Sequence, residues 1–261
     1  VSNVTNMSRM FAGAISFNSS LKNWNVSNVT DMSEMFFGAG LFDQDIGGWT
    51  VTNVTTMKAM FKRASSFNQN ISAWRPQQLT DISYMFDSAS NFNQDIGQWD
   101  VSKVTTMASV FSDAQSFNQN VGPWDVSNVT DMSNMFSRAP FNQNLGNWNV
   151  GKVTDMSGMF FNSHFNYDIS RWDTSNVTTM ESMFGWHAGF AQDLSAWDTS
   201  KVFNFNGMCY HATWMTADLR RWEVGPTATF KDMFTHAGSQ HTKFGSHPFF
   251  GSTPRREFFY A

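Results

Sequence analysis

Hydrophobic and polar positions recur along the chain with a period of about 25 residues, within the roughly 20–50 residues typical of repeat proteins. Each unit carries a Met-Phe pair, as at Met35-Phe36 and Met135-Phe136, and related pairs such as Val110-Phe111 hold the same place in other units. Successive pairs are evenly spaced, except for two steps that are each shorter by a single position. The units of such proteins pack on their neighbours. We therefore interpret the chain as a tandem array of about ten units.

The two halves of each unit differ in the spacing of their apolar residues. In the second half they fall at i, i+3, i+6 and i+7, as at Val129, Met132, Met135 and Phe136. This spacing predicts a short α- or 3₁₀-helix. The first half contains Gly and no helical stripe, so we expect a short strand near the recurring Trp. We therefore predict an α/β repeat solenoid similar to leucine-rich repeats, with one short strand and one short α- or 3₁₀-helix per unit.

One Trp recurs once in each of nine units, and its column supplies much of the apolar mass. The column comprises Trp24, Trp49, Trp74, Trp99, Trp124, Trp148, Trp172, Trp197 and Trp222. A residue that recurs in every unit is normally one that every unit buries. We expect Trp99, Trp124 and Trp148 to stack in one continuous core, facing Met132 and Phe136. The alternative is that the column stacks against sugars.

The repeat pattern weakens after Val202 and ends at Phe234. We therefore divide the chain into a repeat array at 1–234 and a tail at 235–261. The tail is rich in Gly, Ser, His, Pro and Phe. Because the last core of a stacked array needs a cover, we expect this tail to be a C-terminal cap. The alternative is a docking tail.

Two phrases carry a resemblance to a known family. They are Phe92-Asn-Gln-Asp-Ile-Gly-Gln-Trp-Asp-Val101 and Val126-Ser-Asn-Val-Thr-Asp-Met-Ser-Asn-Met-Phe136. They closely resemble the BspA-like repeat of bacterial surface proteins and lipoproteins, including those of mycoplasmas, and of secreted or surface proteins of some algae and protists. The resemblance covers roughly residues 1–234. It implies a leucine-rich-repeat-like solenoid with an adhesive or protein-binding role, an extracellular or cell-surface location and no catalytic residues.

Charge and composition narrow the classes of partner. The net charge is −4 and the charges are scattered, whereas nucleic-acid binding needs a basic stripe. No apolar run approaches the ~20 residues of a membrane-spanning helix, so we expect no membrane span. The single Cys209 excludes a disulfide framework. The chain begins at Val1 within a unit, and we expect it to be a fragment or a processed piece.

Two sets of polar residues are candidate metal ligands. One is an acidic column that comprises Asp45, Asp95, Asp168, Asp193 and Asp218, and a second acidic column follows the Trp. Stacked carboxylates could hold calcium, but Asn replaces Asp in other units, so we favour side chains that cap backbone turns. The other set is His164, His187, His211 and His236, which we interpret as a polar loop face rather than a metal site. Several Asn-x-Ser/Thr sequences are formal glycosylation acceptors. We predict no cofactor, no metal and no catalytic residues.

Aromatic residues outside the core columns gather late in the chain. Such residues are the usual anchors of interfaces, so we place the principal partner surface within residues 184–261. The predicted partner-binding residues are Trp186, His187, Tyr210, His211, Trp214, Phe249, Phe250, Phe258, Phe259 and Tyr260. The alternative is that these residues only build the cap.

The sequence thus favours a non-catalytic scaffold for protein–protein interaction or adhesion, whose partner is another protein or extracellular macromolecule. The second hypothesis is a structural subunit of a larger stable assembly, such as a fibre or an organellar complex, with contacts to further copies or other subunits. A carbohydrate-active enzyme is the least favoured, because we identify no inward-facing carboxylate pair.

Overall fold

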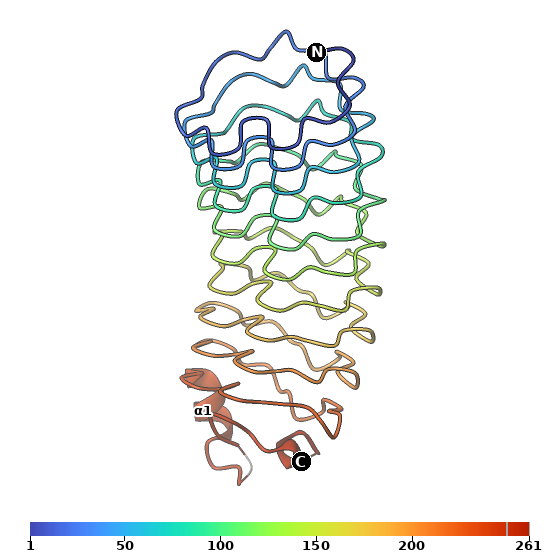
Figure 1. The fold of residues 1–261 in the computed structure, drawn as a ribbon. Coiled ribbons are helices and arrows are strands. Elements are labelled where there is room, and N and C mark those ends of the chain that lie inside the picture. Colours follow the sequence, from blue (N-terminus) through green and yellow to red (C-terminus); the bar gives the residue numbers. More distant parts are fainter. Residues whose placement is uncertain (249, 261) are drawn as a thin grey trace.

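The chain winds into a stack of similar coils that runs from the N-terminus to a differently built C-terminal tail (Figure 1). This computed structural model describes residues 1–248 and 250–260. Isolated parallel β-bridges join one register of successive coils. The bridged residues are Asn6, Asp31, Thr56, Asp81, Thr106, Asp131, Asp155, Thr179, Asn204 and Thr229. Each coil therefore corresponds to one sequence unit.

The helices of the described residues both lie in the tail, where α1 spans Gly238–Phe244 and η1 spans Arg256–Tyr260. The array itself carries turns and single bridges where the sequence predicted a short helix and a short strand. The bridge falls on the residue after the Val-Thr pair, as at Asp131, and not beside the recurring Trp.

Hydrogen bonds explain why a helical spacing produces turns. Met35 N–H donates to Met32 C=O within its coil at 3.2 Å, whereas Glu34 N–H donates to Lys58 C=O of the next coil at 2.8 Å. A helix keeps its N–H bonds within the segment, but here they alternate between the coil and its neighbour. Turns that close over three residues also bring i and i+3 to one side. Apolar periodicity is therefore the same for this run of turns as for a short helix.

The turns depend on two left-handed backbone positions in each coil. The first precedes the Met-Phe pair, as at Glu34 (φ 54°), and the second lies two residues after the Phe, as at Gly38 (φ 69°). Non-glycine residues in this region cost roughly 1–2 kcal/mol each. Their N–H groups donate to the next coil, Glu34 to Lys58 and Gly38 to Lys62, each at 2.8 Å. The inter-coil bonds thus offset the local strain.

Aromatic rings fill the core in continuous stacks. The ring centroid of Phe36 lies 3.9 Å from that of Phe42 in its own coil and 5.6 Å from that of Phe61 in the next coil. Both pairs of rings are nearly parallel. Trp49 and Trp74 stack at 6.4 Å with 3° between their planes. Such contacts join all coils into one hydrophobic cluster of buried residues.

The predicted burial of the Trp column is confirmed from Trp49 to Trp222, whereas Trp24 in the first coil is partly buried. Trp99, Trp124 and Trp148 are each 4% exposed, and Met132 and Phe136 lie in the same buried cluster. Each indole N–H also donates to a backbone C=O of the preceding coil, as from Trp124 Nε1 to Ile96 C=O at 3.0 Å. The same bond recurs from Trp49 to Trp222. The Trp column therefore supplies both packing and a buried hydrogen-bond ladder.

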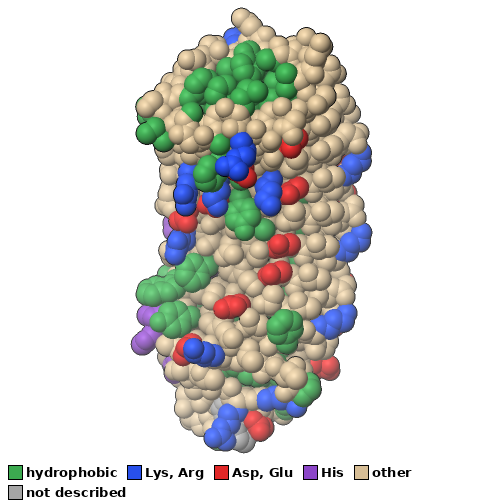
Figure 2. Space-filling model, viewed as in Figure 1, with side chains coloured by type: hydrophobic (Ala, Val, Ile, Leu, Met, Phe, Trp, Pro, Cys, Tyr) green, Lys and Arg blue, Asp and Glu red, His purple; other side chains and the backbone are tan. Residues whose placement is uncertain are grey.

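The two ends of the stack differ. At the C-terminal end, Phe234 N–H donates to Ser252 C=O and Asp232 N–H donates to Thr253 Oγ1, both at 2.9 Å, in place of a further coil. Phe258 and Phe259 are buried against this end. The tail is thus placed as a cover over the last coil. At the other end, Figure 2 shows hydrophobic side chains gathered where the N-terminal coil lies.

Replacement of one core Trp tests the Trp ladder. We expect Trp124→Ala to lower the free energy of unfolding by ~3–5 kcal/mol, because it opens a cavity and leaves the buried Ile96 C=O without its donor. Denaturant unfolding measures this loss. Trp214→Ala is the matched control, since Trp214 is 66% exposed, and should change stability by less than about 0.5 kcal/mol. A loss below ~1 kcal/mol for Trp124→Ala contradicts the ladder.

A pair of glycine substitutions tests the left-handed turns. Gly207 has φ +61°, and an added Cβ would lie 3.1 Å from Ser182 Oγ. We expect Gly207→Ala to destabilise the protein by ~1–2 kcal/mol. Gly225 lies outside the left-handed region, and its added Cβ would meet only Ser200 C=O at 3.7 Å. Gly225→Ala should therefore be neutral or stabilise by up to ~1 kcal/mol. Equal thermal unfolding midpoints for the two variants would refute the proposed role of the turns.

Candidate functional site

Three of the predicted partner-binding residues lie together on the outside of the stack, with one further histidine beside them. We call Trp186, Tyr210, His211 and His236 the aromatic row. Trp186 and His211 stack with ring centroids 4.0 Å apart and 3° between their planes. Tyr210 meets His211 edge-on at 4.6 Å, and His236 lies 4.4 Å from His211. The row therefore forms one continuous aromatic and imidazole surface.

The coil geometry places the row. Trp186, His211 and His236 hold the second left-handed position of three successive coils, with φ values of 56°, 57° and 59°. Trp186 N–H donates to Tyr210 C=O, and His211 N–H donates to Thr235 C=O at 2.8 Å. Because these bonds fix the distance between coils, side chains at the same register stack on one another.

The aromatic row is accessible at Trp186 and His236 and partly exposed between them. Trp186 is 50% exposed, and His236 is also exposed. Figure 2 shows histidines on one edge of the stack beside exposed hydrophobic side chains. Partial burial, together with the nearby His236, lowers the pKa of His211 below its usual value. The row thus offers ring faces and imidazole nitrogens without requiring a charge on His211.

His187 does not belong to this surface, although the sequence placed it there. Its side chain is fully buried between Phe184 and Phe190, which it meets edge-on at 6.2 and 5.7 Å. Its Nδ1 accepts a hydrogen bond from Gly189 N–H at 3.3 Å. Burial lowers the pKa of His187 to about 4. The residue is therefore a neutral part of the core at neutral pH.

The predicted tail residues lie in the cover of the last coil. Phe258 and Phe259 are 0% and 2% exposed, so their side chains leave no surface for a partner. Phe250 is half-buried and stacks on Phe234 at 5.3 Å. Tyr260 is 57% exposed, but its hydroxyl donates to Val224 C=O at 2.8 Å. Phe249 lies outside the described residues.

Trp214 lies beside α1 and lines a groove with Thr216 and Lys243. No contact joins this indole to the aromatic row in the described part of the chain. The predicted surface is therefore divided between two places, the row and the groove.

The acidic columns cap backbone turns. Asp95 Oδ1 accepts Gly97 N–H and Asn120 Oδ1 accepts Gly122 N–H, both at 2.9 Å. Aspartate and asparagine therefore serve the same purpose, which confirms turn capping as the interpretation of the column. Across the described residues, no group of three or more His, Cys, Asp or Glu side chains could hold a metal ion. Burial raises the pKa of the Cys209 thiol well above its usual value.

His236 is the member of the row that the predicted site omitted. The signal was present, because Trp186, His211 and His236 follow one another at the spacing of the repeat. The residues around Trp214 carry no comparable signal, since they come from coil segments and from α1 outside the repeat.

The fold and surface define a tandem-repeat protein with stacked coils and an exposed aromatic row. The chain belongs to the family described as "Mycoplasma protein of unknown function, DUF285", whose model matches residues 1–94, 71–164 and 139–247. The tandem-repeat interpretation is thereby confirmed. No curated protein and no solved structure gives a significant match to the chain. No helix in the described residues is long and apolar enough to cross a membrane.

Burial of His187 predicts a loss of stability in mild acid. Its pKa is about 4 in the folded protein and about 6.5 when unfolded, so the unfolded state binds more protons between these values. The contribution of neutral His187 to the free energy of unfolding is therefore fully present above pH ~6.5. It is lost as the pH falls towards ~4, by up to about 3 kcal/mol. Denaturant unfolding at several pH values measures this slope.

His187→Leu is the matched variant, because it removes the titrating group and keeps an apolar side chain at the site. Its free energy of unfolding should change less than that of the wild type over the same range of pH. Parallel pH profiles for the two proteins would contradict a buried, neutral His187.

Proposed function

We propose that the protein is a non-catalytic repeat scaffold that binds another protein through the aromatic row. The observation that carries the proposal is the stacked arrangement of Trp186, Tyr210, His211 and His236 on the outside of the coils. Tyr and Trp are enriched at protein interfaces, and a few such residues carry most of the binding energy. Stacking of these rings on one another supports this role, because it restricts their side-chain torsions before a partner binds.

The proposal extends to adhesion at a cell surface or in the extracellular space. Its support is the resemblance of the repeat phrases to BspA-like repeats, together with the low content of charged residues, 15%. We also propose that the stack is a leucine-rich-repeat-like solenoid in the broad sense, in which core columns are constant and outer columns vary. Recognition then depends on the outer residues of particular coils.

The alternative is a structural subunit in a larger assembly, in which the row contacts a further copy or another subunit. A binding experiment, combined with a measurement of the molecular mass in solution, distinguishes recognition of a partner from the assembly role. If the protein is monomeric in solution and captures a surface protein, recognition is favoured. If it self-associates and Trp186→Ala abolishes this association, the assembly role is favoured.

The test compares three immobilised proteins, namely wild type, Trp186→Ala/His211→Ala and the control Leu41→Ala. Leu41 is 56% exposed in a coil far from the row. Solubilised surface proteins are passed over each, and a captured protein is then purified and titrated. We expect the row variant to bind about 30-fold more weakly, since hot-spot residues contribute ~2 kcal/mol or more. The control should bind like the wild type.

Unfolding midpoints are measured for all three proteins. Unchanged midpoints with binding lost only in the row variant support the proposal. Equal binding by all three proteins, or a lowered midpoint with binding intact in the row variant, overturns it.

A further inference from the structure

A groove runs between α1 and the coil segment at 213–221, apart from the aromatic row. It consists of two depressions of ≈ 590 Å³ and ≈ 450 Å³, and both are lined by Thr216 and Lys243. The first is bordered by Trp214, and the second by Arg220, Arg221 and two carboxylates. The two depressions therefore adjoin at Thr216 and Lys243 and differ in chemistry.

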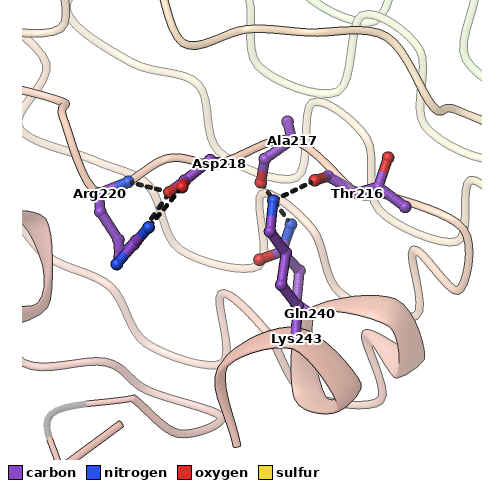
Figure 3. Close-up of polar contacts among 6 residues, drawn as sticks. All are labelled: Thr216, Ala217, Asp218, Arg220, Gln240 and Lys243. Atoms are coloured by element: carbon purple, nitrogen blue, oxygen red, sulfur yellow. Dashed lines mark hydrogen bonds and ion pairs between the residues drawn. The ribbon is translucent and has the colours of Figure 1, made fainter.

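Buried contacts of α1 fix this groove. Gln240 is fully buried, and its Nε2 donates to Met215 C=O at 3.2 Å and to Ala217 C=O at 2.8 Å. Figure 3 shows Gln240 and Lys243 on α1, facing the coil segment that carries Thr216 and Asp218. Lys243 Nζ donates to Thr216 C=O at 3.0 Å. The walls are thus held in place without a ligand.

One depression suits the face of a sugar ring. Trp214 is 66% exposed, so its indole is available as a flat apolar platform. Hydroxyls of Thr213, Ser239 and Thr242 surround it, and these donate to backbone carbonyls. A hydroxyl that donates retains oxygen lone pairs for an incoming donor. An aromatic face with acceptor oxygens around it matches a pyranose, which has apolar C–H faces and hydroxyl edges.

The other depression suits an anion. Arg220 is bound to Asp218 in two contacts at 2.9 and 2.7 Å, and this hydrogen bonding lowers the pKa of Asp218 to about 2. These two charges therefore cancel. In the described residues, neither Arg221 nor Lys243 forms an ion pair. Three cations against Asp193 and Asp218 give a local charge of +1 on a chain whose net charge is −4.

We propose that this groove binds a carboxylate-bearing oligosaccharide. Trp214 lies under a sugar ring, and Lys243 and Arg221 hold the carboxylates. A single small anion would leave the Trp214 depression empty. An acidic peptide would satisfy the cations but would present no hydroxyl-edged ring to the indole. The site is independent of the aromatic row, so failure of one proposal leaves the other intact.

Titration calorimetry with the full chain tests this proposal. The probes are a hexasaccharide of alternating glucuronate and N-acetylglucosamine, a neutral hexasaccharide of N-acetylglucosamine, and a hexaglutamate peptide. We expect the acidic saccharide to bind at least about tenfold more tightly than either of the others, because only it uses both depressions. Its affinity should fall as salt rises, since exposed charges are screened.

Two exposed substitutions locate the binding. Trp214→Ala and Arg221→Gln should each weaken the acidic saccharide at least about tenfold, with unfolding midpoints unchanged. Phe203→Ala is the control, since Phe203 is 52% exposed outside the groove lining. The proposal is overturned if no saccharide binds, if the peptide binds as tightly, or if the neutral saccharide binds equally well. Binding that survives both substitutions overturns it too.

Discussion

The structure depends on backbone hydrogen bonds that alternate between a turn and the next coil. Glu34 and Gly38 N–H groups reach the following coil, while Met35 N–H closes its own turn. This alternation requires left-handed backbone at two positions per coil, a strain that a lone coil could not sustain. Each unit is therefore folded only against its neighbours, as in other stacked repeat proteins. A substitution that blocks these bonds weakens two coils together.

Because the coils are evenly spaced, residues that hold the same position in successive repeats lie next to one another in the structure. In the core the columns give stacked Phe rings and a ladder of indole N–H donors, such as Trp124 to Ile96. Outside, the same geometry stacks whatever residues occupy a register. At the second left-handed register, Trp186, His211 and His236 follow one another and form the aromatic row. The scaffold and the proposed recognition surface thus arise from one constraint.

The tail contributes both an end to the stack and a second surface. By supplying Ser252 and Thr253 as acceptors, it satisfies donors that a further coil would otherwise bond. Its helix α1 also brings Lys243 opposite Trp214 and Thr216. The groove therefore forms beside α1, where the regular array stops. This groove depends on α1, whereas the repeat registers recur from coil to coil.

The sequence by itself determined the period, the number of units, the buried Trp, Phe and Met columns and the end of the array near Phe234. These follow because a residue repeated in every unit is one that every unit buries. Only the tertiary structure decided that turns replace the short helix, because both place i and i+3 on one side. It also moved His187 into the core and separated Trp214 from Trp186. Those outcomes depend on backbone φ angles and on the path of the tail, which residue spacing does not encode.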